Sequence, residues 1–232
     1  MSSPSDYLDG TYLRQNPGWH VADSAWKARQ ILKMLRRNQI APASVYDVGC
    51  GAGEVLRLLQ EKLSSACELW GTDVSPQAIE LAQSRANPNL HFAVWNSDPW
   101  PGKVFDLVIA IDVLAHVEDY RGFLRRIKAQ GAYKLLHIPL DISAQHVLRA
   151  KGMAERRQFH PHLHYFSKHT AMFALTDAGY EIVDWFYTPR MIDIPAHWRG
   201  QLLRLPRKLL FALHQDLAAS LLGGFSLMVL AK

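Results

Sequence analysis

Residues 44–53 restrict the folds that this chain can adopt, because a β-prone run at 44–48 leads directly into the loop Gly49-Cys50-Gly51-Ala52-Gly53. Helical periodicity resumes at Glu54 and continues to residue 63. A strand, a glycine loop and a helix in this order form the crossover unit of several nucleotide-binding folds, whose sheets are parallel. The segment therefore predicts a parallel sheet with a ligand near the glycines.

Strands and helices alternate along the rest of the sequence. The expected strands cover residues 68–72, 90–95, 105–111, 133–138, 181–187 and 225–231, and the expected helices 22–39, 76–85, 120–130 and 168–178. Residues 202–222 show a long amphipathic helical pattern that Pro206 interrupts. We predict an α/β fold with a single doubly wound, mostly parallel seven-stranded sheet, helices on both faces and an antiparallel last strand.

Charge and cysteine content narrow the class of protein. Lys and Arg outnumber Asp and Glu by 26 to 21, and the excess gathers at 27–37, 151–157 and 199–208. Without a nucleic-acid-binding motif, this balance indicates tolerance of anionic partners, and we expect no nucleic-acid partner. The two cysteines make no disulfide framework, and neither a signal peptide nor an apolar run of about 18 residues is present. We therefore expect a cytoplasmic protein with one core.

Two carboxylates beside the loop indicate the charge of its ligand. A dinucleotide site has a glycine at the position of Glu54 and holds a pyrophosphate at the N-terminus of the next helix. Glu54 would repel a diphosphate, and Asp47, near the end of the preceding strand, adds a second negative charge. A cofactor with an ammonium group and a sulfonium is complementary to these charges in a partly dry site. S-adenosyl-L-methionine fits this description.

Asp73 follows the second expected strand, about 20 residues beyond the loop. A carboxylate there can accept hydrogen bonds from both ribose hydroxyls, in an NAD site as well as in an S-adenosylmethionine site. The alternative is that Asp73 is only a turn residue ahead of Ser75, which suits a helix N-cap. Asp73 thus supports a ribose-containing cofactor but does not distinguish NAD from S-adenosylmethionine.

Three segments carry a resemblance to a known family: VYDVGCGAGE at 45–54, GTDVSP at 71–76 and FDLVIAIDVLAHV at 105–117. Together they closely resemble the class I, Rossmann-like, S-adenosylmethionine-dependent methyltransferase superfamily. Within it, the chain is similar to the small bacterial enzymes related to the ubiquinone-pathway O-methyltransferases. The resemblance covers residues 42–140 with specific motifs and 160–232 more loosely.

The resemblance implies a role for each position that matches a family motif. The methionine part of the cofactor is held by Asp47, Gly49, Cys50, Gly51 and Gly53. Ile111 and Asp112 line the cofactor pocket, and His116 lies near the methyl group.

For the nucleoside part, the resemblance implies that Asp73 holds the ribose and that Val74 packs on the adenine. The family usually places an acidic residue on the adenine amino group after the third strand, where this sequence reads WNSD. We therefore expect either Asn96 or Asp98 to make that contact.

Methyl transfer to a hydroxyl is accelerated by a general base, for which histidine is suited near neutral pH. If no general base is used, in-line displacement on the activated sulfonium requires only that the acceptor is aligned and that water is excluded. His116 is the first candidate base, and the alternative is that it caps or packs its loop. His164, with Tyr165 and Phe166, is the second, because similar enzymes have a histidine and aromatic segment facing the acceptor here. His137 is expected to be a core histidine.

The run His160-Pro161-His162-Leu163-His164 could bind a metal if extended, but Pro161 and the lack of a neighbouring cysteine lead us to expect none. The N-terminal aromatic residues Tyr7, Tyr12, Trp19 and Trp26 are candidates for a lid over the cofactor, and the pair Trp19-His20 is the better one. Trp26 is interpreted as core of the first helix.

The segment 204–211 combines basic and apolar residues. One interpretation is a surface for phospholipid or a lipid-linked acceptor, and the favoured one is a helix packed on the sheet with a solvated basic face.

We expect a lid and helix over residues 1–40 and a methyltransferase domain over 41–232, with acceptor-site insertions around 140–165 and 188–222. The predicted function is transfer of a methyl group from S-adenosyl-L-methionine to an oxygen of a small-molecule or lipid-linked acceptor. The alternatives are a non-catalytic cofactor-binding partner subunit and an NAD(P)-dependent oxidoreductase, the second of which Asp47 and Glu54 oppose. Neither the acceptor nor the oligomeric state follows from the sequence.

Overall fold

The structure is a computed structural model, and it describes residues 14, 19, 21–95, 102–149, 153, 157, 162–194 and 204–232. Several residues singled out above lie outside these ranges, namely Tyr7, Tyr12, His20, Asn96, Asp98, His160 and Pro161. Their roles in a lid, an adenine contact or a metal site stay predictions.

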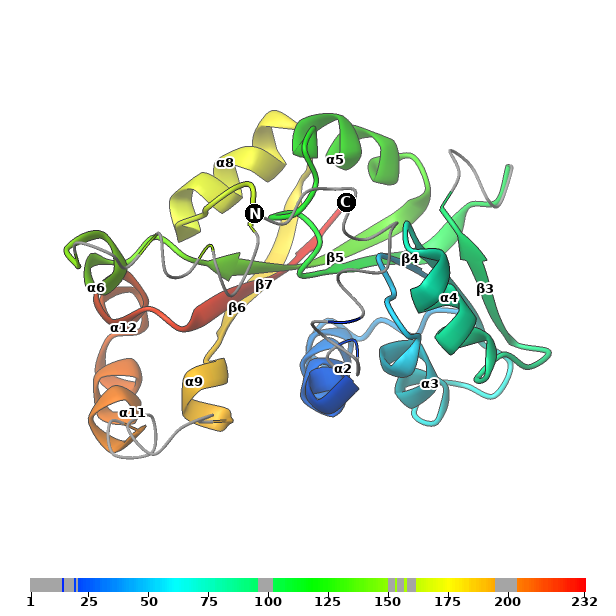
Figure 1. The fold of residues 1–232 in the computed structure, drawn as a ribbon, viewed down its shortest axis with the longest axis horizontal. Coiled ribbons are helices and arrows are strands. Elements are labelled where there is room, and N and C mark those ends of the chain that lie inside the picture. Colours follow the sequence, from blue (N-terminus) through cyan, green and yellow to red (C-terminus); the bar gives the residue numbers. More distant parts are fainter. Residues whose placement is uncertain are drawn as a thin grey trace.

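Seven strands form one sheet in the order β3-β2-β1-β4-β5-β7-β6 (Figure 1). All neighbouring strands from β3 to β5 pair in parallel, whereas β7 pairs antiparallel with both β5 and β6. The fold class predicted from the sequence is therefore confirmed. The bounds are β1 Ser44–Val48, β2 Glu68–Asp73, β3 Leu90–Val94, β4 Phe105–Ile111, β5 Gly131–Leu140, β6 Ile182–Thr188 and β7 Phe225–Ala231.

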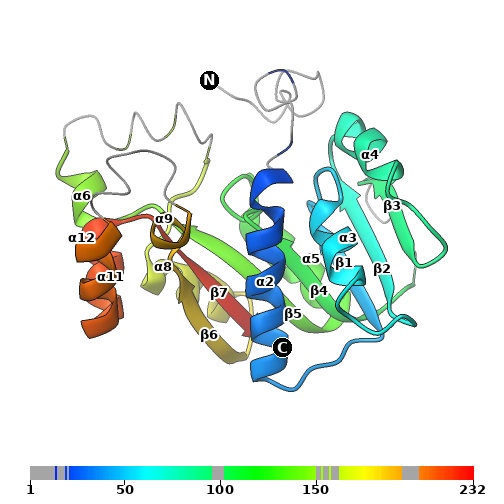
Figure 2. The same cartoon turned by 90° about the horizontal axis from the view of Figure 1, so that it is seen from below.

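Helices cover both faces of this sheet, as Figures 1 and 2 show. Those on one face are α2 (Val21–Arg37), α3 (Glu54–Gln60) and α4 (Pro76–Gln83), and those on the other are α5 (Tyr120–Lys128) and α8 (Lys168–Asp177). Ile31 and Leu56 belong to the apolar core of the first face, and Phe123 and Leu175 to that of the second. Each face of the sheet thus has its own layer of buried side chains.

Within the described ranges, four further helices gather beyond the carboxyl end of β5, apart from α3 and α4 (Figures 1 and 2): α6 (Ala144–Val147), α9 (Arg190–Asp193), α11 (Arg204–Leu213) and α12 (Gln215–Leu222). The interruption expected at Pro206 is wrong, because this residue lies in the first turn of α11, where its missing N–H is tolerated. The break falls at His214, whose Nδ1 accepts a hydrogen bond from Leu217 N and caps α12.

Strand β5 is longer than the sequence pattern indicates. Its last residue, Leu140, pairs with Phe225 of β7, so the antiparallel partner supports the strand beyond residue 138. This extension carries Asp141 to the same edge of the sheet as the glycine loop. In the part of the chain that the structure describes, no helix combines the length and apolarity needed to cross a bilayer.

Candidate functional site

The glycine loop is tied to the end of β2 by backbone hydrogen bonds. The N–H groups of Gly49 and Cys50 both donate to the carbonyl of Thr72, at 2.7 and 2.9 Å. Gly49, Gly51 and Gly53 have φ values of 82°, 55° and 78°, a region that favours glycine. The loop is therefore one tight turn at the carboxyl ends of β1 and β2.

The loop glycines differ in what surrounds them. A Cβ on Gly49 would overlap the Val113 side chain, and a Cβ on Gly53 would lie 2.5 Å from the Phe92 ring. At Gly51 the nearest atom would be in the Trp19 ring, at 3.9 Å. Packing thus requires glycine at positions 49 and 53. A Cβ at Gly51 would have room, and its nearest neighbour would be the Trp19 ring.

Asp47 is a buried carboxylate with an unsatisfied oxygen. It is 2% exposed, and its Oδ1 has no hydrogen-bond partner among the described residues. Burial, together with the negative charge of Asp73, raises the pKa of Asp47 to about 7, although Lys27 acts in the opposite direction. A cationic group on a ligand would stabilise this carboxylate, because an ionised buried group without a partner is unfavourable.

Asp73 accepts two backbone hydrogen bonds, from Gly51 N on Oδ2 and from Ser75 N on Oδ1, each 2.9 Å long. The second is the contact of a turn residue ahead of the helix, and Ser75 does cap α4 by accepting from Ala78 N. The first connects Asp73 to the glycine loop, which a turn role does not require. Val74, the next residue, is apolar and 48% exposed.

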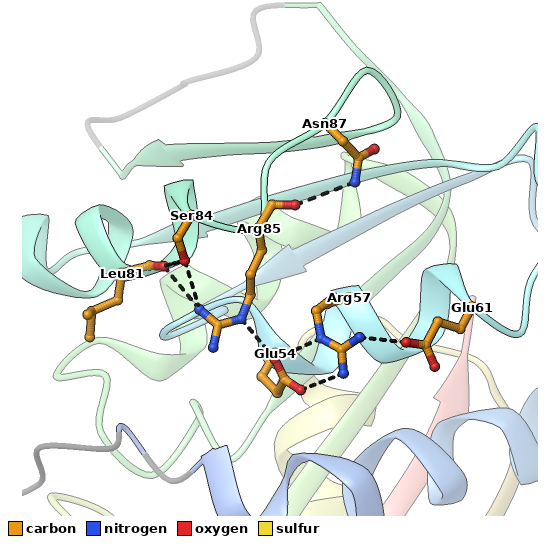
Figure 3. A network of polar contacts seen from close by, with 7 residues as sticks. All are labelled: Glu54, Arg57, Glu61, Leu81, Ser84, Arg85 and Asn87. Atoms are coloured by element: carbon orange, nitrogen blue, oxygen red, sulfur yellow. Dashed lines mark hydrogen bonds and ion pairs between the residues drawn. The ribbon is translucent and has the colours of Figure 1, made fainter.

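Glu54 is neutralised by two arginines, as Figure 3 shows. Its Oε1 and Oε2 bind Arg57 at 2.8 and 3.0 Å, and Oε2 also binds Arg85 at 2.8 Å. The Arg57 hydrogen bond is the main reason that the pKa of Glu54 lies below its usual value. Glu54 therefore joins α3 to the end of α4, and the argument that it repels a diphosphate loses its force. Of the two carboxylates, Asp47 and Glu54, only Asp47 still indicates a positively charged ligand.

Asp112 follows β4 and lies in a network that joins three elements. Its φ is 61°, its Oδ2 pairs with Lys27 Nζ of α2 at 2.8 Å, and its Oδ1 lies 2.5 Å from His137 Nδ1 of β5. Nε2 of His137 reaches Thr188 Oγ1 at 2.7 Å, so His137 is a core histidine, as expected. Burial acts to raise the pKa of Asp112, but Lys27 and His137 hold it well below its usual range.

The structure also locates other residues that the sequence singled out. Ile111, the last residue of β4, is 8% exposed and lies in the core cluster shared with Cys50. Trp26 is core, as expected: it is 2% exposed, its Nε1 donates to Asp193 Oδ2 at 2.9 Å, and its ring meets His137 edge-on. Helix α2 is thus anchored by Trp26 and Lys27 between the cofactor-side loops and α9.

A second polar cluster lies where β4 and β5 end. The buried carboxylate of Asp141, directly after β5, lies 2.5 Å from Nδ1 of His162, which is 5% exposed. The His162 ring meets the partly exposed His116 ring edge-on, with centroids 4.8 Å apart. His116 belongs to the same loop as Val113, which abuts Gly49. The cluster therefore adjoins the glycine loop.

His164 faces a different neighbour. Its Nε2 lies 3.0 Å from the carbonyl oxygen of Glu118, and its ring packs edge-on against Tyr120. The N–H groups of Leu163 and His164 both donate to the Ala115 carbonyl, which holds this segment on the loop after β4. The structure thus brings His162, and not His164, against His116.

Sequence reasoning missed Asp141 and treated His162 only as one of three possible metal ligands. A signal for Asp141 was present, because Asp47, Asp73, Asp112 and Asp141 all stand at or next to the carboxyl end of a strand. These ends meet at one edge of a parallel sheet, where ligands bind. Lys27 gave no such signal, since its position on α2 says nothing of the loop it reaches.

Comparisons with known proteins agree with this geometry. Residues 19–184 match a family model described as a methyltransferase domain. Ajmaline N-methyltransferase of Rauvolfia serpentina is 29% identical over 147 residues, covering 54% of this chain and 50% of that protein. Trans-aconitate 2-methyltransferase of Streptomyces coelicolor is 27% identical over 178 residues, covering 71% and 58%. The chain spans about half the length of these curated relatives.

Among solved structures, magnesium protoporphyrin IX methyltransferase from Synechocystis, with bound SAH, superposes with a TM-score of 0.58 at 16% identity. The match covers 89% of this chain and 81% of that one, and at this identity it concerns the fold. The family model covers well over half of the chain and spans the glycine loop and all the strand-end aspartates described above. The chain therefore belongs to the methyltransferase-domain family, within the class I, Rossmann-like S-adenosylmethionine-dependent methyltransferases.

Proposed function

We propose that this protein transfers the methyl group of S-adenosylmethionine to a hydroxyl oxygen of a small-molecule or lipid-linked acceptor, by in-line displacement. The names of its relatives do not identify one class of acceptor, since they include an N-methyltransferase and a trans-aconitate methyltransferase. The choice rests on residues of this chain at the carboxyl ends of β4 and β5.

The residues around the glycine loop fit the cofactor. The unpartnered Oδ1 of Asp47 suits its ammonium group, and each Asp73 oxygen can accept a further hydrogen bond from a ribose hydroxyl. The exposed side chain of Val74 offers an apolar surface for the adenine. When bound, the cofactor supplies a methyl group on an already activated sulfonium, so the protein need only align the acceptor and exclude water.

The observation that carries the choice of oxygen is the contact of His116 with the Asp141–His162 pair. A carboxylate on Nδ1 fixes the ring orientation of a histidine and stabilises its protonated form. His162, held in this way, fixes the position of the His116 ring against which it packs. A positioned base is needed to remove the proton of a hydroxyl acceptor, because a neutral hydroxyl is a weak nucleophile.

In this arrangement His116 takes the proton from the acceptor oxygen as the methyl group arrives. His162 and Asp141 are positioning residues, which act through the His116 ring. His164, bound to the Glu118 carbonyl, serves to hold the 162–166 segment over the loop after β4.

The test begins with purified protein, methyl-labelled cofactor and fractionated cell extract, followed by mass spectrometry of the fraction that takes the label. We expect an O-methyl product. His116→Ala should then lower turnover about a hundredfold or more with nearly unchanged cofactor affinity, and the rate should recover as pH rises toward the ionisation of the acceptor. Asp141→Asn should lower turnover less and shift the pH profile. His169→Ala, at an exposed histidine of α8, is the matched control and should have no effect.

Three results would overturn the proposal. Label on nitrogen would mean that the acceptor is not a hydroxyl. Normal turnover in His116→Ala would mean that His116 is not a base and that the enzyme works by alignment alone. Cofactor binding without transfer to any fraction would instead identify the protein as a non-catalytic partner subunit.

A further inference from the structure

Helices α11 and α12 carry a row of exposed leucines. Leu205, Leu209 and Leu213 are 65%, 57% and 84% exposed, and they lie four residues apart on one side of α11. Leu217 and Leu221 of α12 follow at the same four-residue spacing in the sequence, and both are more than 40% exposed. These five side chains are called the leucine face below. The segment packs on the sheet as expected, through Phe211 against Tyr187 and Phe225, but its exposed side is apolar as well as basic.

The leucine face has apolar and basic neighbours. Val147 and Leu148, at the end of α6, are also exposed, and α6 packs against α12. Arg204 and Lys208 each precede a leucine of the row, so these two exposed cations line one edge of it. Neither is paired with a carboxylate among the described residues. Exposed apolar side chains next to cations that lack partners call for a partner that is both apolar and anionic.

The position of α11 leaves this surface open. Helix α11 contacts α12 and α9 and packs on the edge of the sheet through Phe211, which stacks on Phe225 of β7, and Figures 1 and 2 both show it at the periphery of the molecule. Arg207, on the inner side of the same helix, is 8% exposed and has no partner among the described residues. Burial, and secondly the nearby charge of Arg149, lowers the pKa of Arg207.

We propose that the leucine face, with Arg204 and Lys208, docks on a membrane surface that contains anionic phospholipids. An amphipathic helix of this kind lies in the plane of the interface, with its leucines among the acyl chains and its cations at the headgroups. A second copy of this chain is a poorer occupant, because a two-fold interface would bury Arg204 and Lys208 of both copies against another apolar and basic face. Membrane docking does not depend on which acceptor is methylated.

The consequence concerns the acceptor side of the site. α6 begins just after Asp141, and α12 leads into β7 beside β5, so the docking helices stand at the same edge of the sheet as His162. Docking would turn this edge toward the bilayer. An acceptor held in the membrane could then reach His116 without leaving the lipid surface entirely.

The test is co-sedimentation of the purified chain with vesicles of phosphatidylcholine alone or with about one third phosphatidylglycerol. We expect binding to the anionic vesicles, weakening as salt rises from about 0.05 to about 0.5 M. Leu209→Glu/Leu213→Glu should reduce partition about tenfold for each leucine lost. Arg204→Ala/Lys208→Ala should reduce it about fivefold for each charge, and only with anionic vesicles.

The matched control is Val104→Glu/Phe173→Glu, which places the same charges at two exposed apolar residues elsewhere on the surface. It should bind vesicles as the wild type does, apart from a small loss common to any added acid. Three outcomes would overturn the proposal: no binding by the wild type at low salt, equal losses in control and test variants, or a wild-type dimer that Leu209→Glu/Leu213→Glu dissociates. Because no cofactor or acceptor enters the assay, its failure leaves the proposed function untouched.

Discussion

Replacing Asp47 by asparagine should make the protein more stable and its cofactor binding weaker. The carboxylate is buried and its Oδ1 has no partner among the described residues, so ionisation in the folded protein is unfavourable. Its pKa rises from 3.8 to about 7, mainly through burial and secondly through Asp73. At about 1.4 kcal/mol per pKa unit, this rise corresponds to roughly 4 kcal/mol of lost stability at pH 8.

The sign of the pH dependence follows from which state binds the proton. Between pH 4 and 7 the folded protein holds a proton on Asp47 that the unfolded chain has released, so stability from this group falls as pH rises through that window. The amide of the Asp47→Asn variant does not titrate. The variant should therefore resemble the wild type near pH 4 and exceed it increasingly up to about pH 8. At about 2–4 °C per kcal/mol for a chain of this length, the gain at pH 8 is roughly 10 °C.

Cofactor binding should respond in the opposite direction. The ammonium group of the cofactor favours the ionised carboxylate, so the affinity of the wild type should rise with pH up to about pH 7. Asp47→Asn should lose that pH dependence and bind S-adenosylhomocysteine about 10- to 100-fold more weakly at pH 8, as expected for a charge-assisted contact.

Thermal unfolding and titration calorimetry at pH 5, 6.5 and 8 measure both effects. Asp177→Asn is the matched control, because this aspartate is exposed and its ion pair with Arg121 is 3.7 Å long, so neither quantity should change. An Asp47→Asn variant with wild-type melting temperature and wild-type affinity at pH 8 would refute the reasoning.

Three further predictions concern the same site. S-adenosylmethionine and its demethylated product should raise the melting temperature, whereas NAD and NADP should not, and stabilisation by NAD alone would contradict the cofactor assignment. Asp73→Ala should weaken cofactor binding by about 1.5–3 kcal/mol in calorimetry. An unchanged affinity would mean that Asp73 is a turn residue and does not bind the ribose. Gly53→Ala should destabilise the protein by several kcal/mol more than Gly102→Ala, because both glycines have positive φ but only Gly53 would bring its Cβ against Phe92. Equal melting temperatures of the two variants would show that the Phe92 contact relaxes freely.

The sheet could be predicted from the sequence because its signals are local. Apolar runs, the Ser75 cap and the glycine loop each act within a few residues, and their order determines a parallel crossover. The two errors in element bounds had different causes, one local and one long-range. Pro206 is compatible with a first helical turn as well as with a break, and β5 gained residues from its pairing with Phe225 of β7.

Charge partners could not be predicted in the same way. Glu54 was interpreted as a charge in the pocket, but Arg57 is one turn away on the same helix and Arg85 arrives from the end of α4. His164 and His162 differ by two residues in sequence, and in an extended segment they lie on the same side. The difference between them comes from their neighbours: Asp141 is within reach of His162, and the Glu118 carbonyl is within reach of His164.

The four aspartates at the carboxyl ends of β1, β2, β4 and β5 share a position in the fold but differ in their hydrogen-bond and charge partners. The positions of Asp47, Asp73 and Asp112 could be inferred from the strand pattern, whereas Asp141 follows the unforeseen extension of β5. All four lie at the ligand edge. Their partners decide what each does: backbone N–H groups hold Asp73, Lys27 and His137 hold Asp112, and His162 holds Asp141. Of these four, all within the described ranges, only Asp47 has a buried oxygen left without a partner there. A ligand cation is therefore expected at Asp47, and the other three serve to hold the surfaces around it.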